Sequence, residues 1–485
     1  MAALALREDT LDRFDRRVKV PTYDRGALTP AVVHLGVGCF HRSHQAVYFD
    51  EIAARGISTD WGIVGVGMRS PESRDALVAQ DTLWSVVERA ALRDRVRVIG
   101  VMGRCLFAPE EREAVLGALT DPRTRVVTMT VTATAYRTDT EEFRQDLAAE
   151  EPNTVPGYLV EALDRRRRSG AGPFTVLSCD NLPGNGEVAR RAVLTFAMER
   201  DDELADWIRE HVSFPNSMVD RITPRTTDAD CAALAREFGV EDRCPVVTEP
   251  FSQWIVEDAF CNGRPPLDAV GVQLVRDVRP YALMKTRMLN AAHVAVGHVG
   301  GLAGLRRMDE AMRDPVVAAF ADGLKREVAP LLPPVPGVDL DQYRETLLTR
   351  FANPRVADQL CRLGRNGSGK VPAHVLSSVH RAVAEDRPCE LLLHAVAAWM
   401  RLLRGADDAG RPLEVEDPML ATLQPLARAG GSDPRPLLSV GAVFGDLRED
   451  LGFVAALAWA LEAQDRLGVR AAVAEVLSAA AGVAA

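Results

Sequence analysis

The sequence predicts an α/β architecture in two parts, a doubly wound parallel-sheet domain in residues 1–279 and a mostly α-helical domain in residues 280–485. In the first part, short apolar runs rich in β-branched residues alternate with segments of helical periodicity. Such alternation is typical of a parallel sheet covered by helices. In the second part the helical patterns continue, but few β-branched runs remain. At 485 residues the chain is also too long for one ordinary domain.

The composition excludes several classes of protein. Apolar residues make up 47% of the chain and charged residues 26%, a balance typical of a globular protein with a sizeable core. A net charge of -10 disfavours nucleic acid and anionic membranes as partners. The eight cysteines lack the spacing of a zinc site, and no apolar run is long enough for a membrane span or a signal peptide. We therefore expect a cytoplasmic protein with reduced cysteines.

The alternation begins with the apolar run of residues 31–35, which we expect to form the first strand. A glycine turn, Gly36 and Gly38 in the letters GVG, follows it, and a helical pattern covers residues 43–54. A glycine turn between a strand and a helix is the setting of a dinucleotide-binding fingerprint. Gly36 would form the tight turn, and Gly38 would let backbone N–H groups approach a pyrophosphate, while His41 takes the place of the third glycine. This predicts a Rossmann-type doubly wound domain.

The same alternation continues along the chain. Further strands are expected at residues 61–67, 83–87, 96–102, 125–132 and 174–179, with 270–275 as the last strand of the sheet. Helices are expected at residues 71–80, 110–119 and 158–168, and in the second domain at 315–328, 342–351, 371–385, 390–403 and from 451 to the end. Doubly wound sheets bind ligands outside the carboxyl ends of their strands. Gly36, the threonines at 130 and 132, and Asn181 all fall at such predicted ends.

The first helix of the second domain carries three polar side chains, Lys285, Asn290 and His293, in the segment KTRMLNAAH. At about 100° per residue, Asn290 lies about 140° and His293 about 80° from Lys285, so the three share one side of an α-helix. An amine, an amide and an imidazole together can take a proton from an alcohol and hydrogen-bond the remaining oxygen. Taken alone, the spacing is more often that of a solvated lysine, an interior amide and a core histidine.

Five segments together resemble one family, the polyol-specific long-chain dehydrogenases. They are GVGCFHRSHQAVY, SCDNLPGNG, SFPNSMVDRITP, EPFSQWIVED and KTRMLNAAH, which begin at residues 36, 178, 213, 249 and 285. The set is specific because the segments occur in the family's order and at compatible spacing. The resemblance implies a Rossmann-type domain followed by a helical domain. It also implies a metal-independent oxidoreductase that uses NAD or NADP.

For the chemical step, the resemblance implies roles for four residues. Lys285 would be the general base in alcohol oxidation and the acid in ketone reduction. Asn290 and Asn181 would polarise the reacting oxygen, and His293 would orient the substrate. A zinc-free alcohol dehydrogenase needs a base that titrates near neutrality, and a desolvated lysine can reach a pKa of about 7–8.

For substrate binding, the resemblance implies Asp220, Arg362 and Lys370, which would contact the more distant hydroxyls. Since a sugar-acid carboxylate would need a further cation, we expect a polyol and its 2-ketose, D-mannitol and D-fructose, with D-arabinitol also accepted. Two alternatives stay open, a fructuronate or tagaturonate reductase and a catalytically idle dinucleotide-binding sensor. No partner other than this small-molecule substrate is expected, and the protein would be a monomer or a small homo-oligomer.

For the cofactor, the sequence offers two opposing signals. The second strand ends at Gly67, so the adenosine ribose of a dinucleotide should lie near residues 68–72. Glu72 would accept a hydrogen bond from the ribose 2′-hydroxyl, whereas Arg69 would pair with a 2′-phosphate. Phe40, two residues after Gly38, completes the expected cofactor site. Because the five segments look most like those of NAD-preferring members, we expect NAD rather than NADP, and no metal.

Two positions depart from the family pattern. Residues 130–136 read TVTATAY where the family usually shows TxTExGY, so Ala133 replaces a carboxylate. Ala282 stands three positions before Lys285, where relatives often carry an acidic residue. The first departure affects the expected positioning near the nicotinamide, and the second affects any carboxylate-gated proton route to the lysine.

Overall fold

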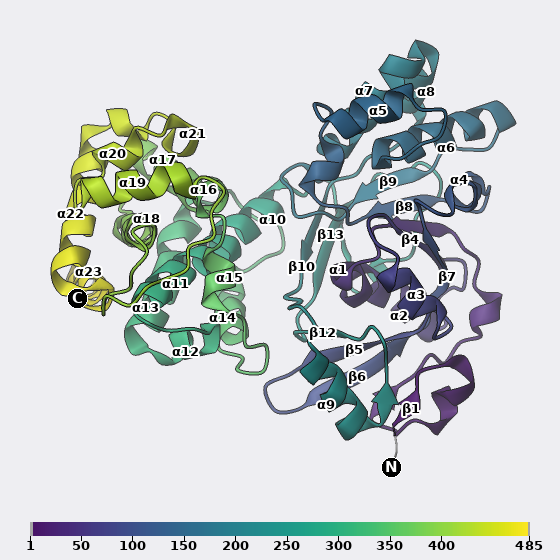
Figure 1. The fold of residues 1–485 in the computed structure, drawn as a ribbon, viewed down its shortest axis with the longest axis horizontal. Coiled ribbons are helices and arrows are strands. Elements are labelled where there is room, and N and C mark those ends of the chain that lie inside the picture. Colours follow the sequence, from purple (N-terminus) through teal and green to yellow (C-terminus); the bar gives the residue numbers. More distant parts are fainter. Residues whose placement is uncertain (1–2, 484–485) are drawn as a thin grey trace. The chain divides into compact units, whose positions relative to one another are not determined.

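The computed structural model describes residues 3–483. The chain divides into two compact units, Met1–Arg279 and Pro280–Ala485. Within the described residues every β-strand lies in the first unit, and the second unit is built from helices and loops (Figure 1). The expected fold class, an α/β unit followed by a mostly helical unit, is therefore confirmed.

A five-stranded parallel sheet forms the centre of the first unit. Its strands are β3 (Val32–Leu35), β4 (Ile63–Gly67), β7 (Met102–Phe107), β8 (Val126–Met129) and β9 (Thr175–Ser178). They are arranged in the order β7-β4-β3-β8-β9, so β4 and then β7 are added on one side of β3, and β8 and then β9 on the other. β3, β8 and β9 are buried along their whole length, as expected for strands covered on both faces. Such a sheet binds its ligand where the strand order reverses, outside the carboxyl ends of β3 and β8.

Helices cover this sheet on both faces. They are α2 (Gln45–Ala54), α3 (Glu72–Val78), α4 (Arg112–Thr120), α5 (Glu141–Ala148), α6 (Val155–Ser169), α7 (Asn185–Arg200) and α8 (Asp202–His211). Helices α5 to α8 gather beside β8 and β9 (Figure 1). The bounds of α6 follow from its sequence: the Thr154 side chain caps its first turn, Pro156 stands in that turn, and Gly170 ends the helix at φ 72°.

Residues 270–275 do not form the last strand of the parallel sheet, so this prediction was wrong. β14 (Gln273–Val275) instead pairs with β13 (Gln253–Glu257), which pairs with β10 (Ser217–Asp220) in a separate three-stranded sheet. Gly271, at φ 95°, interrupts the apolar run and leaves only three half-buried residues in the strand. A strand of a parallel sheet with helices on both faces would be more deeply buried.

The runs 83–87 and 96–102 also form strands outside the parallel sheet. β5 (Trp84–Arg89) and β6 (Asp94–Ile99) pair antiparallel, between β12 (Val246–Thr248) and β2 (Val18–Lys19). Residues 90–93 connect them directly, and parallel pairing would need a crossover of a dozen or more residues. The third strand of the parallel sheet is β7, which begins only at the last residue of the predicted run.

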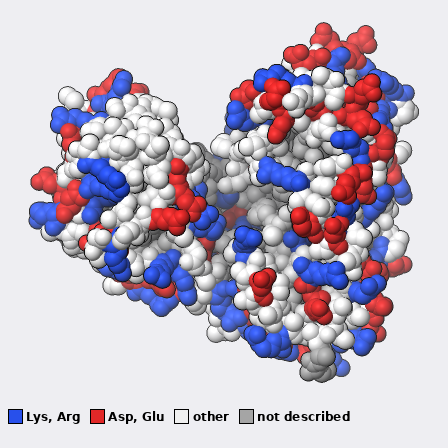
Figure 2. Space-filling model, in the orientation of Figure 1, with Lys and Arg blue, Asp and Glu red and all other residues white. Residues whose placement is uncertain are grey.

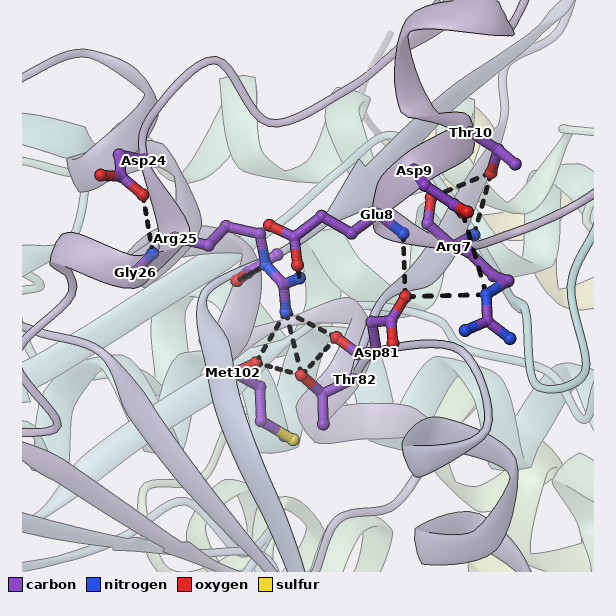
Figure 3. A network of polar contacts seen from close by, with 11 residues as sticks. Arg7, Glu8, Asp9, Thr10, Asp24, Arg25, Gly26, Asp81, Thr82 and Met102 are labelled. Atoms are coloured by element: carbon purple, nitrogen blue, oxygen red, sulfur yellow. Dashed lines mark hydrogen bonds and ion pairs between the residues drawn. The ribbon is translucent and has the colours of Figure 1, made fainter.

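The N-terminal segment is fastened to the first unit by Arg25 (Figure 3). Its guanidinium donates hydrogen bonds to the carbonyl oxygens of Asp81 at 2.6 Å and Met102 at 3.2 Å, and to the Glu8 carboxylate at 2.8 Å. Asp81 and Thr82 both adopt left-handed backbone conformations, at φ 54° and 57°. These conformations are unfavourable outside glycine, so the turn that leads into β5 depends on such contacts.

The second unit is organised around the buried helix α11 (Ala291–Leu302). Helices α13 (Pro315–Val328), α15 (Leu360–Gly364) and α18 (Glu390–Leu402) pack against it. Gly297 lets α15 approach closely, since a Cβ on this residue would lie 3.1 Å from the backbone nitrogen of Gly364. The other helices are α10 (Arg279–Met284), α12 (Met308–Arg313), α14 (Leu340–Phe351), α16 (Gly367–Lys370), α17 (Ser377–Ala384), α19 (Leu420–Gly430), α20 (Arg435–Leu438), α21 (Gly441–Phe444), α22 (Leu451–Leu467) and α23 (Val469–Val483).

The charged side chains of the first unit are mixed in sign on the face drawn in Figure 2, where lysines and arginines are interspersed with acidic residues. A surface of this kind has no extended field of one sign. Among the helices of the described residues, none is long and apolar enough to cross a membrane.

Candidate active site

The glycine turn after β3 lies directly against the end of β8. Gly36 has φ 94°, and a Cβ on it would lie 2.3 Å from the carbonyl oxygen of Thr130. Only glycine fits there, because any side chain would collide with backbone that cannot move aside. Gly38, which precedes the short helix α1 (Cys39–Ser43), is exposed and has no atom closer than 3.9 Å to the position of a Cβ. The turn is therefore tightly packed at Gly36 and open to solvent at Gly38.

Two buried histidines support this turn from below. His34 Nε2 donates to the carbonyl oxygen of Gly36 at 3.1 Å, and its Nδ1 accepts from the Thr128 hydroxyl at 2.8 Å. His41, in the place of the third fingerprint glycine, stacks on the His34 ring with 3.3 Å between the ring centroids. Burial lowers the pKa of His34 to about 3 and the pKa of His41 well below its usual range. Both rings are therefore neutral at neutral pH and pack as part of the turn.

A cavity of about 820 Å³ opens above the carboxyl ends of β3, β4 and β8. Gly36, Gly38 and Arg69 line it together with Thr132 and the first turn of α6. Arg69 donates to the Thr132 hydroxyl at 3.0 Å, so its side chain reaches from the end of β4 to the loop after β8. This volume is in the usual range for a ligand-binding pocket.

Two residues expected at the cofactor are not among those that line this cavity. The ring of Phe40 stacks on His44 instead, with 4.9 Å between the ring centroids. Glu72 is exposed in the first turn of α3, where hydrogen bonds from the Ser70 side chain and a backbone N–H lower its pKa. The structure thus brings Gly36, Gly38 and Arg69 together and leaves Phe40 and Glu72 outside.

Asp180, which the sequence did not single out, holds the loop after β8. Its carboxylate accepts hydrogen bonds from the backbone N–H of Thr132 at 2.8 Å and from the hydroxyl of Tyr136 at 2.6 Å. Thr132 has φ 77°, an unfavourable conformation for a β-branched residue, so this loop needs such support. Ala133, the departure from the family motif, directly follows it and is exposed.

The other two site residues of the first unit lie at strand ends. Asn181 follows Asp180 after β9, and its side chain is exposed. Asp220 is the last residue of β10 and is 3% exposed. Polar residues are common at such ends in ligand-binding α/β domains.

In the second unit, Lys285 to Asn290 form a π-helical segment between α10 and α11. The backbone N–H of Ala291 donates to the carbonyl oxygen of Thr286, five residues earlier. The angles expected for an α-helix therefore do not apply across this segment. A π turn places residues five apart about one turn from each other, so Asn290 lies closer to the side of Lys285 than the α-helical spacing implied. Single π turns in α-helices occur frequently at functional sites.

Lys285 is 7% exposed and lies close to His293. The His293 ring stacks on Phe351 with 4.4 Å between the ring centroids. Burial holds the pKa of His293 well below its usual range, and the nearby charges of Arg350, Arg362, Lys325 and Lys285 lower it further. The imidazole beside the buried lysine is therefore neutral at neutral pH.

Arg362 and Lys370 lie in the same basic region of the second unit. Arg362 is ion-paired with the buried Asp358 through both Nε and Nη2. The Lys370 ammonium donates to the carbonyl oxygen of Leu363 at 3.0 Å, and burial followed by the charge of Arg362 lowers the pKa of Lys370. The lysine thus sits at the end of α15, where carbonyl oxygens face outward.

His374 is a further member of this region that the sequence did not identify. It lies in a second π-helical segment, Val371–Leu376, which packs against the first. Burial lowers the pKa of His374 to about 4, and the charges of Lys370 and Lys285 add to this effect. The four-residue spacing between Lys370 and His374 would have indicated a shared helical face.

These features fit a dinucleotide in the first unit and proton transfer in the second. The turn at Gly36 has no room for a side chain, whereas the space beside Gly38 would let a pyrophosphate approach the backbone. The second unit places a buried amine next to neutral imidazoles. Among the described residues, no group of three or more His, Cys, Asp or Glu side chains is arranged to hold a metal ion.

The first unit is a doubly wound sheet with a glycine turn and a cavity at its switch point, and the helical second unit contains a buried lysine. This combination defines a dinucleotide-dependent oxidoreductase. More narrowly, the chain belongs to the mannitol dehydrogenase family. Residues 30–269 match the mannitol dehydrogenase Rossmann domain, and residues 277–465 match the mannitol dehydrogenase C-terminal domain. The resemblance carried by the five sequence segments is therefore confirmed.

Individual relatives cover almost the whole chain. The mannitol 2-dehydrogenase of Aspergillus clavatus is 44% identical over 472 residues, which are 93% of this chain and 94% of the relative. Among solved structures, the Pseudomonas fluorescens mannitol 2-dehydrogenase in ternary complex with NAD and D-mannitol is 39% identical, with a TM-score of 0.88, 98% of this chain covered and 100% of that chain. A D-sorbitol dehydrogenase in substrate-free form is 36% identical, with a TM-score of 0.90, and covers 97% of this chain and 100% of its own.

Proposed function

We propose that the protein is a NAD-dependent, metal-independent oxidoreductase that interconverts a polyol and its 2-ketose. Its substrates are D-mannitol and D-fructose, and D-arabinitol is also accepted. The observation that carries this proposal is the buried Lys285 on a π turn beside Asn290 and the neutral His293. The mannitol 2-dehydrogenase that binds NAD and D-mannitol, 39% identical to this chain, supports the choice of substrate and cofactor.

In the oxidation, the polyol loses a hydride from its carbinol carbon and a proton from the hydroxyl on that carbon. Lys285 Nζ takes the proton, and in ketose reduction the same nitrogen returns it to the carbonyl oxygen. A bound nicotinamide ring supplies the acceptor or donor of the hydride. Asn290 and Asn181 donate hydrogen bonds to the reacting oxygen, which stabilises the negative charge that develops there.

His293 orients the substrate in this proposal. Its neutral imidazole can accept a hydrogen bond from one hydroxyl at one ring nitrogen and donate from the other. Asp220, Arg362 and Lys370 contact the more distant hydroxyls. Because Asp358 already neutralises Arg362, this arginine suits a neutral polyol better than a sugar acid.

One observation favours the second candidate, a fructuronate or tagaturonate reductase. The buried Arg350 precedes Phe351 at the end of α14, and its charge acts on His293 more strongly than any other nearby charge. An arginine next to the residue that orients the substrate is what a carboxylate would require. The sequence alone did not place this cation near the site.

The decisive experiment compares kcat/KM for D-fructose and D-fructuronate, each reduced with NADH, and for D-mannitol oxidised with NAD. We expect D-fructose to be preferred, because a site that pairs with hydroxyls discriminates strongly against substrates that leave those groups unpaired. A preference for D-fructuronate of about tenfold or more would select the second candidate. If neither substrate is turned over while NADH still binds, the chain is a dinucleotide-binding sensor.

A further inference from the structure

Lys325 is a buried lysine that the proposed reaction does not use. It lies on α13, is 1% exposed, and its ammonium donates to the carbonyl oxygen of Ala321 at 3.0 Å. The same nitrogen lies 4.5 Å from the centroid of the Phe351 ring, within the range of a cation–π interaction. Lys325 therefore contacts the aromatic ring that also packs on His293.

Three helices contribute to this arrangement. Phe351 is the last residue of α14, and its ring is stacked with the imidazole of His293 on α11 at an interplanar angle of 23°. Lys325 lies on α13, which packs against both of these helices. The buried Phe351 ring thus contacts the Lys325 ammonium from one helix and the His293 imidazole from another.

Packing alone does not account for a lysine at this position. Burial lowers the pKa of Lys325 to about 7, although the carboxylate of Asp322 opposes the shift, and the Arg344 guanidinium adds to it. Asp322 is itself paired with Arg344 and Arg326. Burying an ammonium with few partners costs free energy that an apolar side chain of the same length would not. Such an unfavourable group beside a site is a candidate for a functional role.

We propose that Lys325 is a positioning residue for His293. Through the ring of Phe351 it fixes the orientation of the imidazole that orients the substrate. This inference rests on the role of His293 in the proposed function. It adds two residues, Lys325 and Phe351, that touch neither substrate nor cofactor but determine how well the reacting groups are aligned.

The first test compares four variants in ketose reduction. Lys325→Met and Phe351→Leu should lower kcat by about 10- to 100-fold, because small misplacements of a positioning group have large effects on rate. The KM for the ketose and the Kd for NADH should stay within about twofold of wild type. Lys325→Arg keeps a cation over the ring and should restore most of the activity. Arg326→Met, which removes the exposed neighbour on the same helix, is the matched control and should behave as wild type.

A double-mutant cycle separates positioning from a purely structural role. If Lys325 acts only through His293, Lys325→Met should add no further loss in a His293→Gln background. An additive loss, or a wild-type kcat for Lys325→Met, would overturn the proposal. If Lys325→Met does not fold, the same cycle is run with Phe351→Leu, to which the same two outcomes apply.

A spectroscopic readout does not depend on turnover. In protein with isotope-labelled histidine, the ring signal of His293 is the one that is missing from His293→Gln. Phe351→Leu should move this signal through loss of the aromatic ring current, and Lys325→Met should move it in the folded protein as well. An unchanged signal in Lys325→Met would contradict the proposal. Because this measurement needs no substrate, it stays informative if wild-type protein turns over no polyol or ketose and the proposed function fails.

Discussion

Gly36 and Thr130 are in direct backbone contact: a Cβ on the glycine would lie 2.3 Å from the carbonyl oxygen of the threonine. This contact brings the carboxyl ends of β3 and β8 together at the switch point of the sheet. A Cβ on the neighbouring Gly38, at φ -96°, would meet only the carbonyl oxygen of Gly36, at 3.9 Å. The two glycines of one turn therefore serve different purposes, close packing at Gly36 and access to the backbone at Gly38.

Gly36→Ala should abolish measurable dinucleotide binding and lower the midpoint of thermal unfolding. The methyl group would force β3 and β8 apart, and φ 94° is itself unfavourable for alanine. Gly38→Ala is the matched control and should keep the wild-type unfolding midpoint while it weakens dinucleotide binding. Titration with NADH followed by fluorescence, together with thermal unfolding, checks both expectations. Equal losses of stability in the two variants would contradict this division of roles.

The strand, glycine turn and helix of the proposed cofactor site could be predicted because their signals are local. A strand, a glycine turn and a helix follow one another within a few residues, and the structure has them there. Asp180 was not predictable, because its partners Thr132 and Tyr136 are more than forty positions away in the sequence and meet it only through the order of the strands. The sheet assignment of residues 270–275 failed for the same reason, since periodicity does not identify the partner strand.

Lys285→Ala should lose most turnover while it retains NADH binding. General acid–base catalysis contributes roughly 10²–10⁴-fold, so kcat should fall within that range. Steady-state kinetics of D-fructose reduction and a separate NADH titration measure the two effects. A variant that keeps more than about a third of wild-type turnover would exclude Lys285 from general acid–base catalysis.

The choice between NAD and NADP is tested at Arg69 and Glu72. We expect kcat/KM to be higher with NADH than with NADPH. Arg69 lines the cavity and Glu72 does not. Arg69→Ala should therefore lower kcat/KM for NADPH further, while Glu72→Ala should leave the ratio of kcat/KM for NADH to kcat/KM for NADPH unchanged. A wild-type preference for NADPH would show that the preferred cofactor carries a 2′-phosphate. A large effect of Glu72→Ala would show that the ribose does not lie where we expect it.

For the proposed catalytic residues, the sequence suggests which side chains take part but not their geometry. The segment KTRMLNAAH identifies Lys285, Asn290 and His293, yet nothing in the letters distinguishes a π turn from an α-helix. Phe351 and Lys325 lie on separate helices and approach His293 only in the packed unit. His374 could not be identified from the sequence, because its role depends on its neighbours in space. These are Lys285, in the first π segment, and Lys370, the last residue of α16.

The protein should lose stability in mild acid because of its buried histidines. The pKa of His34 is lowered from 6.5 to about 3 by burial, so the unfolded chain binds a proton at this position between pH 6.5 and pH 3 and the folded chain does not. The stability from neutral His34 is present above pH 6.5 and is lost as the pH falls toward 3. At pH 5 the free energy of unfolding is lower by about 2 kcal/mol than at neutral pH because of His34. His298, with a pKa lowered to about 4, acts in the same direction.

Urea unfolding at pH 5 and pH 7.5 measures this effect. His34→Gln should be less stable than wild type at pH 7.5, since it loses the stacking on His41, but its stability should change less between the two pH values. The exposed His211 provides the control, and His211→Gln should show the wild-type dependence on pH. If wild type and His34→Gln lose the same free energy of unfolding between pH 7.5 and pH 5, His34 does not stay neutral in the folded protein.

Arg25→Met should destabilise the first unit without changing the chemistry of the site. The Arg25 side chain is 9% exposed and donates to the backbone carbonyls of Asp81 and Met102, so its loss leaves partly buried acceptors without this donor. We expect the free energy of unfolding to fall by about 2–4 kcal/mol, the cost of several such groups.

Arg17→Met, which removes an exposed arginine paired with Asp15, is the control and should change the free energy of unfolding by less than about 0.5 kcal/mol. The kcat of Arg25→Met at a temperature where it is folded should equal that of wild type. A loss of stability no larger than in Arg17→Met would show that the left-handed turn at Asp81 and Thr82 does not depend on Arg25.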